Sequence, residues 1–161
     1  KLSHVLAIED EAFPPCERLG GPLLQHHATL RTSGLLVAEL GSDVAGYLLF
    51  SRTADTGIIA KIAVASAYQR QGVGDALIQR AVAELQGSSR RSATEIMLHV
   101  DPRREGARRL YESRGFVETE LLRNYYEDHR DAIVMKLQPQ SGRSRPSIAA
   151  AAMQRRVQLD E

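Results

Sequence analysis

The sequence predicts a single α/β domain, and three observations carry this expectation. The chain has 161 residues, 43% hydrophobic and 25% charged, as in one ordinary globular domain with a substantial core. A β-branched apolar run at 57–64 leads through a glycine-containing loop into an amphipathic helical pattern at 73–85. Further strand-like runs and another helical pattern follow as far as residue 137.

The first part of the chain is expected to form two helices and a pair of strands. Residues 3–12 have the apolar positions of a short helix, which Phe13-Pro14-Pro15 ends because a residue before proline disfavours the helical conformation. A second helix is expected around His26-His27. Runs at 35–40 and 44–52, joined by a Gly-Ser-Asp connection, predict two strands.

The later part of the chain is expected to begin with a polar connection at 88–92 and a strand at 95–100. In this strand, Ile96, Leu98 and Val100 alternate with His99 on the opposite side. The remaining elements are expected to be a helix at 105–114 that Gly115 ends as a C-cap, and two strands, at 116–122 and 132–137, around a polar loop.

The loop between the strand at 57–64 and its helix is the most informative segment. Gly72 and Gly74 allow a tight curl that exposes amide N–H groups at the positive end of the helix dipole, and Arg70 adds a charge. A Walker A loop would need Gly-Lys-Ser/Thr where Gly74 precedes Asp75, and a Rossmann fingerprint would need a glycine near Leu77. The loop therefore predicts another kind of pyrophosphate site, although a Gly-x-Gly pair alone would also fit a plain tight turn.

Four motifs in this order resemble the GNAT superfamily of N-acetyltransferases. Gln69-Arg70-Gln71-Gly72-Val73-Gly74 resembles its acetyl-CoA loop, and the segment at 107–116 resembles its A-x-x-L-Y-x-x-x-G-F helix and turn. Phe13-Pro14 and Arg123-Asn124-Tyr125-Tyr126 are similar to the protein N-terminal acetyltransferase branch, which includes the bacterial ribosomal-protein S18 alanine acetyltransferases. The segment from His99 to Arg104 also resembles that of plant plastid GNAT acetyltransferases. The resemblance covers about residues 2–137.

This resemblance implies the GNAT fold, in which a mixed, mainly antiparallel sheet has helices on both faces. The sheet would split between the strands at 57–64 and 95–100, and coenzyme A would lie in the split. The domain would span 1–137, with its first strand missing or upstream. A linker-like tail at 138–161 would follow, either with a short alanine-rich helix at 148–159 or disordered.

The resemblance also implies acetyl-CoA as co-substrate. Backbone amides of the strand at 62–64 would bind the pantetheine arm like an added strand and polarise the acetyl carbonyl. Arg104 stands where the family has an asparagine that touches the cofactor or orders the loop. The arginines of this region could also bind the 3′-phosphate or an acidic substrate, or form an exposed helix face: Arg103, Arg104, Arg108 and Arg109. The expected cofactor-binding residues are Ile62, Ala63, Val64, Arg70, Gln71, Gly72, Val73, Gly74, Asp75 and Arg104.

Acyl transfer to an amine needs a group that removes an amine proton and a group that protonates the leaving thiolate. His99 titrates near neutrality and is the candidate base, directly or through water; the alternative is a histidine hydrogen-bonded within the sheet. Tyr111 is the general acid that the resemblance implies; the alternative is an aromatic that packs on Leu110 and Phe116.

Substrate contacts are expected at Phe13, Pro14, Tyr125 and Tyr126, the two tyrosines because they lie in a polar loop between strands. His26-His27 has no partners at ligand spacing, so no metal is expected. The expected activity is acetyl transfer to an amine, foremost the α-amine of a protein or peptide N-terminus. The alternatives are a lysine or small-amine acetyltransferase and a non-catalytic CoA-binding module.

Charge and composition exclude other partners. A net charge of +1 argues against nucleic acid and anionic membranes, and no apolar run approaches the length of a membrane span. The single cysteine, Cys16, rules out an intramolecular disulfide and indicates a reducing compartment. The expected location is therefore cytoplasmic, or plastid or another organelle after removal of a transit peptide. The sequence makes no prediction of oligomeric state.

Overall fold

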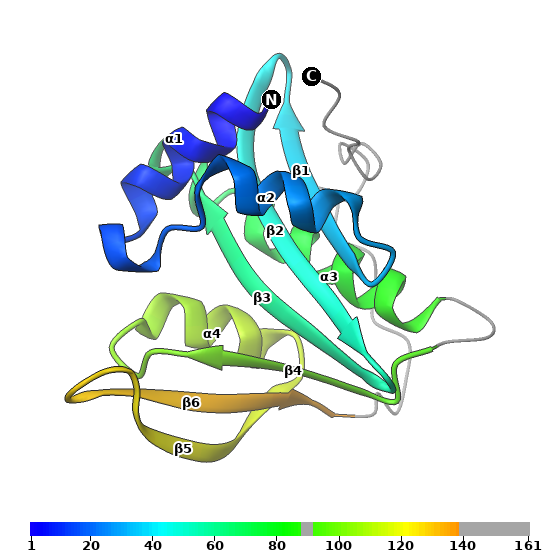
Figure 1. The fold of residues 1–161 in the computed structure, drawn as a ribbon, viewed down its shortest axis with the longest axis vertical. Coiled ribbons are helices and arrows are strands. Elements are labelled where there is room, and N and C mark those ends of the chain that lie inside the picture. Colours follow the sequence, from blue (N-terminus) through cyan, green and yellow to red (C-terminus); the bar gives the residue numbers. More distant parts are fainter. Residues whose placement is uncertain (88–91, 139–161) are drawn as a thin grey trace.

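A six-stranded sheet with strand order β1-β2-β3-β4-β6-β5 forms the centre of the molecule (Figure 1). The structure is a computed structural model that describes residues 1–87 and 92–138. Its elements are α1 (Leu2–Ala12), a 3₁₀ turn η1 (Pro15–Glu17), α2 (Gly20–Thr29), β1 (Ser33–Leu40), β2 (Asp43–Thr53), β3 (Thr56–Val64), η2 (Ser66–Tyr68), α3 (Val73–Gln86), β4 (Glu95–Val100), α4 (Glu105–Ser113), β5 (Phe116–Glu127) and β6 (Arg130–Leu137).

The sheet is mixed and mainly antiparallel, and it splits where the family resemblance implies. β1 and β3 pair antiparallel with β2, and β6 pairs antiparallel with both β4 and β5. The parallel pair of β3 and β4 joins only Thr56–Ile59 to Glu95–Leu98. Beyond Ile59, β3 stays on β2 while the end of β4 stays on β6, so the two halves of the sheet separate.

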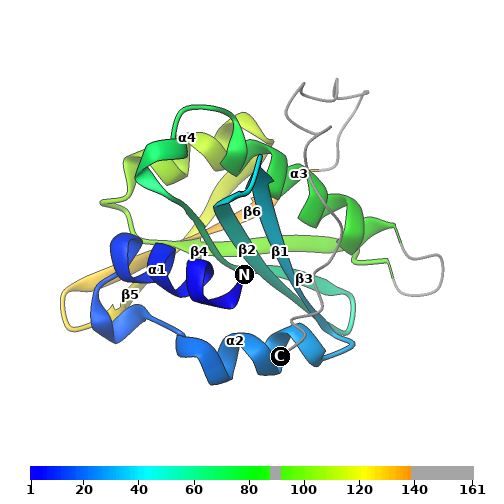
Figure 2. The same ribbon diagram turned by 90° about the horizontal axis from the view of Figure 1, so that it is seen from above.

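Helices cover both faces of the sheet, as predicted. α1 and α2 lie on one face, and α3 and α4 lie on the other (Figure 2). Each face has its own hydrophobic core. Val5, Ile8 and Leu24 pack with β1–β3 on the first face, whereas Leu77 and Ile78 of α3 pack with the strands on the second.

Close packing of α3 on β3 depends on a glycine within the strand. A Cβ added to Gly57 would lie 2.9 Å from Leu85 Cδ1, closer than side chains tolerate. The missing side chain lets the last turn of α3 approach the strand, and this contact fixes the helix over the part of β3 that still pairs with β4.

The last hairpin differs from the prediction. β5 continues to Glu127, so Tyr125 and Tyr126 lie in the strand; placing them in a polar loop was wrong. The ladder shifts between Leu122 and Glu127, where Asn124 adopts a φ of +52°. Asp131 of β6 stabilises this irregularity because its carboxylate accepts the backbone N–H of Asn124 at 3.0 Å. A side chain thus replaces a ladder hydrogen bond, which strand periodicity does not reveal.

The other predicted elements agree with the structure to within one or two residues where they fall in its described part. The connection at 88–92 falls outside it except for Ser92, and so does the tail at 138–161 except for Gln138. In residues 1–87 and 92–138, no helix is long and apolar enough to cross a bilayer.

Candidate active site

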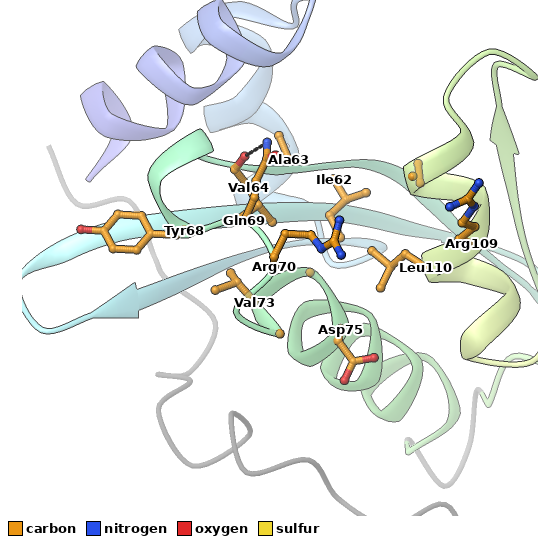
Figure 3. A pocket seen from close by; sticks show the side chains of 14 residues that line it. Ile62, Ala63, Val64, Tyr68, Gln69, Arg70, Val73, Asp75, Arg109 and Leu110 are labelled. Atoms are coloured by element: carbon orange, nitrogen blue, oxygen red, sulfur yellow. Dashed lines mark hydrogen bonds between the residues drawn. The ribbon is translucent and has the colours of Figure 1, made fainter.

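The glycine-containing loop forms one wall of a cavity of about 590 Å³ between β3, α3 and α4 (Figure 3). β3 contributes its last residues, α3 its first turn and α4 the face that turns toward the loop. The cavity is lined by Ile62, Ala63, Val64, Tyr68, Gln69, Arg70, Gly72, Val73, Gly74, Asp75, Gly106, Ala107, Arg109 and Leu110. We call it the loop cavity.

The backbone of the loop adopts the curl that its glycines predict. Gly72 caps α3 with a φ of +82°, and Ala76 donates the first helical hydrogen bond to the Gly72 carbonyl at 3.0 Å. The amides before Ala76 therefore have no partner within the helix. At Gly74, an added Cβ would lie 3.0 Å from Leu110 Cδ2, so α3 approaches α4 as closely as a glycine allows. Free amides at a helix N-terminus form a site for an anion.

The charges around the loop cavity favour a phosphate-bearing ligand. Arg70 from the loop and Arg109 from α4 flank the cavity on two sides (Figure 3). Asp75 in the first turn of α3 would repel an anion. Its carboxylate, however, accepts hydrogen bonds from Nε and Nη2 of Arg114, at the end of α4. The ion pair cancels this negative charge and joins the two helices.

All the residues expected to bind the cofactor line this cavity, except Gln71 and Arg104. The exposed side chain of Gln71 turns back to donate to the Ala67 carbonyl at 3.1 Å. Arg104 lies elsewhere: its guanidinium donates to Glu17 at 2.7 Å and faces the Phe13 ring. Of the four arginines considered from the sequence, Arg109 alone borders the loop cavity.

A second cavity, of about 420 Å³, lies where the sheet splits, and we call it the split cavity. Ile62 and Ala107 border both cavities, so the two meet across the split. Its lining combines apolar, aromatic and charged side chains: Phe13, Cys16, Glu17, Leu19, Ile59, Ala60, Lys61, Ile62, His99, Val100, Asp101, Arg104, Ala107, Tyr111, Tyr126, Glu127 and Arg130.

Tyr111 lies in the split cavity one helical turn after Ala107, the α4 residue common to both cavities. Only 6% of the residue is exposed, and its ring meets Phe116 edge-on with centroids 6.0 Å apart. Burial raises the pKa of the phenol, so it keeps its proton at any neutral pH. Tyr111 therefore packs as an aromatic and is also one of the residues that line the split cavity.

His99 lies on the face of β4 that the alternating pattern predicts, between buried Leu98 and Val100. Its ring stacks on Tyr125 at 4.7 Å between centroids, with the planes 5° apart. Partial burial lowers the pKa of His99, and the charge of Glu120 opposes this shift only in part. The imidazole is therefore neutral near pH 7 and can accept a proton.

The predicted substrate contacts divide between the cavity and the surface. Phe13 and Tyr126 line the split cavity, and burial raises the pKa of Tyr126 to about 12. Pro14 and Tyr125 are not among its lining residues, and Tyr125 is 48% exposed behind His99. His26 and His27 meet edge-on at 6.0 Å, away from both cavities.

The sequence reasoning missed a network of charges around the split cavity. Glu9 is only 1% exposed and binds Lys61 Nζ at 2.9 Å. Burial alone would raise the pKa of Glu9, but hydrogen bonds from Tyr47 and Lys61 bring it below its usual value. Arg130 forms a second set of pairs, with Glu17 and Asp101. Each partner is distant in sequence, and the one available signal is a charged residue within an apolar run, as at Lys61.

Comparison with known proteins agrees with this geometry. Residues 3–116 match the acetyltransferase (GNAT) family. An N-alpha-acetyltransferase of Sulfurisphaera tokodaii is 32% identical over 115 residues, which are 64% of this chain and 68% of that protein. A ribosomal protein bS18-alanine N-acetyltransferase of Escherichia coli is 36% identical over 97 residues, 58% of this chain and 64% of that protein. The chain thus spans slightly less than two thirds of the latter's length.

The fold is shared with solved structures as well. The crystal structure of the ribosomal-protein-S18-alanine N-acetyltransferase from Escherichia coli has a TM-score of 0.71 and 27% identity, covering 89% of this chain and 92% of that one. The split sheet, the loop cavity and the family match together identify this chain as an acetyl-CoA-dependent member of the acetyltransferase (GNAT) family.

Proposed function

We propose that this acetyltransferase transfers the acetyl group of acetyl-CoA to the α-amine of a protein or peptide N-terminus. The observation that carries the proposal is the meeting of two cavities at Ile62 and Ala107. The loop cavity suits the phosphates of the donor. The split cavity suits an acceptor whose amine reaches the junction, because His99 and Tyr111 both line this cavity.

In the proposed reaction, one residue takes a proton from the amine and another gives a proton to the leaving thiolate. The amine nitrogen attacks the acetyl carbon, a C–N bond forms and the C–S bond breaks. His99, neutral because burial lowers its pKa, takes the amine proton directly or through water. Tyr111, protonated because burial raises its pKa, gives its proton to the leaving thiolate. Backbone N–H groups of the β3 segment at 62–64 polarise the acetyl carbonyl.

An α-amine suits this site better than a lysine side chain does. The α-amine has a pKa near 8 and lysine a pKa near 10.4, so deprotonation at pH 7 costs about 1.4 and about 4.6 kcal/mol respectively. One histidine with a lowered pKa matches the smaller cost. Two relatives described above, from Sulfurisphaera tokodaii and Escherichia coli, carry names of N-terminal acetyltransferases, and these names support the same acceptor class.

The test compares two peptide sets with acetyl-CoA. One set has free N-termini and no lysine; the other has blocked N-termini and one internal lysine. We expect a higher kcat/KM on the free N-termini, measured as CoA thiol release and located by mass spectrometry. An equal or higher kcat/KM on the blocked peptides would assign the enzyme to lysine acceptors, and no thiol release from either set would indicate a non-catalytic CoA-binding module.

Gly74→Val is the matched negative control. Its Cβ alone would lie 3.0 Å from Leu110 Cδ2, and the branch methyls would extend into the loop cavity. We expect this variant to lose acetyl-CoA binding and activity while its circular dichroism spectrum remains that of a folded protein. Binding at wild-type affinity would remove the loop cavity from the donor site.

A further inference from the structure

One carboxylate joins three segments around the split cavity. Glu17, in the turn between α1 and α2, accepts Arg104 Nη2 on Oε2 at 2.7 Å and Arg130 Nη2 on Oε1. Arg104 is the N-cap residue of α4 and Arg130 begins β6, so the partners lie 87 and 113 residues away in sequence. Side chains of Glu17 and Arg130 are only 16% and 15% exposed, which keeps solvent from screening their attraction.

The same guanidinium groups lie against the aromatic walls of the cavity. Arg104 is 4.8 Å from the centroid of the Phe13 ring, and Arg130 is 5.2 Å from that of Tyr126. Phe13 directly follows α1 and Tyr126 lies in β5, and both line the split cavity. Glu17 therefore binds both guanidinium groups, that of Arg104 against Phe13 and that of Arg130 against Tyr126.

The other side of the same turn is fixed independently. Glu9, buried in α1, accepts the backbone N–H of Leu19 at 2.8 Å and binds Lys61 of β3. Lys61 in turn donates to the Glu17 carbonyl and lies 4.2 Å from the Phe13 ring centroid. With this anchor in place, the Glu17 carboxylate sets how far the turn stands from α4 and β6.

We propose that Glu17 is a positioning residue that sets the width of the split cavity between Phe13 and Tyr126, and with it the affinity for the acceptor. The inference rests on the proposed function only in taking that cavity as the acceptor site. Arg104 then acts in acceptor positioning through Glu17, instead of binding the donor. Glu17, Arg104 and Arg130 do not line the loop cavity, so acetyl-CoA binding should not depend on them.

The first experiment separates the Michaelis constants of the two substrates. Glu17→Gln keeps the shape of the side chain but loses the charge, so Arg104 loses its carboxylate partner and Arg130 keeps only Asp101 and Glu127. We expect the peptide KM to rise about tenfold, while the acetyl-CoA KM stays within about twofold. A purely structural role would lower the melting temperature and the active fraction, and hence the apparent kcat, without moving the peptide KM.

Glu95→Gln is the matched control. Glu95 also accepts a charged hydrogen bond, from Lys136 Nζ at 2.8 Å, but borders neither cavity. It should leave both Michaelis constants unchanged. A double-mutant cycle of Glu17→Gln with Arg104→Gln should show that the two effects on the peptide KM are not additive, since both remove one contact.

A second readout does not need activity. Cys16, the chain's one cysteine, is next to Glu17, and its thiol donates to Glu127 Oε1 at 3.1 Å, which raises the thiol pKa. In Arg104→Gln the turn should move away from Glu127, and Cys16 should react with a neutral disulfide reagent about threefold faster at pH 7.5. Loss of a cation would by itself slow this reaction, so acceleration reports movement of the turn.

The outcomes separate the two proposals. If the wild type acetylates no peptide, the proposed function fails, and thiol reactivity still decides whether the Glu17–Arg104 contact holds the turn. A raised peptide KM in Glu17→Gln and faster thiol reaction in Arg104→Gln support the inference. An unchanged peptide KM in an active Glu17→Gln enzyme, or equal thiol rates in wild type and Arg104→Gln, overturns it.

Discussion

At His99, the sheet and the ring of Tyr125 remove water from one imidazole and so set its titration. Burial lowers the pKa of this imidazole, which therefore stays neutral over more of the acid range than a solvated histidine does. The part of the acid-side loss of activity that His99 causes should therefore begin only below the ordinary histidine value of about 6.5.

The pH profile of kcat/KM for a peptide tests this role. The acceptor amine, with a pKa near 8, and His99 must both be unprotonated. The logarithm should fall with a slope of one below about pH 8 and with a slope of two below the His99 pKa. In His99→Ala the slope should stay at one. Tyr125→Phe keeps the stacked ring and should keep the wild-type profile; a slope of two in His99→Ala would assign the second proton elsewhere.

The sequence places some of these residues and not others, for a physical reason. His99 follows from the alternation of β4, and Tyr111 from a motif within one helix, so both depend on neighbours in sequence. Arg104 depends on Glu17, a partner 87 residues away that only the folded chain brings near. The sequence does not reveal this contact, so the expectation that Arg104 binds the cofactor could not take it into account.

Among the elements, α3 and α4 meet through a charge pair at the loop cavity. Asp75 lies at the positive end of α3, where the phosphates of the donor are expected, and Arg114 follows the last turn of α4. An unpaired carboxylate here would repel the donor and also weaken the contact between the helices.

Arg114→Met should raise the dissociation constant of CoA about tenfold, measured by titration calorimetry, because Asp75 is left charged at the phosphate site. Adding Asp75→Asn should restore most of the affinity. Arg80→Met, which breaks the Arg80–Glu84 pair on the outer face of the same helix, is the control and should bind as wild type. Unchanged CoA affinity in Arg114→Met would show that the loop amides determine this affinity and that the Asp75 carboxylate has no effect on it.

β5 shows where element prediction from sequence stops. Polar Arg123 and Asn124 suggest the end of a strand, yet β5 continues because Asp131 binds both: Arg123 Nη1 donates to it at 2.8 Å and Asn124 N at 3.0 Å. The extra length of β5 affects the candidate active site, because it lets Tyr125 stack on His99. A loop would not hold that ring in place.

For the whole molecule, periodicity together with one family resemblance was sufficient to predict the fold but not the charge pairs. The split sheet, the helices on both faces and the glycine loop follow from alternation, helical spacing and one resemblance. The charged network of Glu9, Lys61, Glu17 and Arg130 does not, because it joins α1, β3, the turn after α1 and β6. Local sequence patterns predict single helices and strands, whereas these ion pairs form between different elements.

The junction at Ile62 and Ala107 has a consequence for the order of events in turnover. Under the proposed function each substrate would have its own cavity, one beside α3 and the other beside the turn after α1, so neither would have to depart before the other arrives. Cys16, with its raised pKa, is poorly suited to carry the acetyl group between them. Initial-rate plots at several acetyl-CoA concentrations should therefore intersect, and Cys16→Ser should leave that pattern intact. Parallel lines would instead reveal an acetylated enzyme waiting alone for its acceptor.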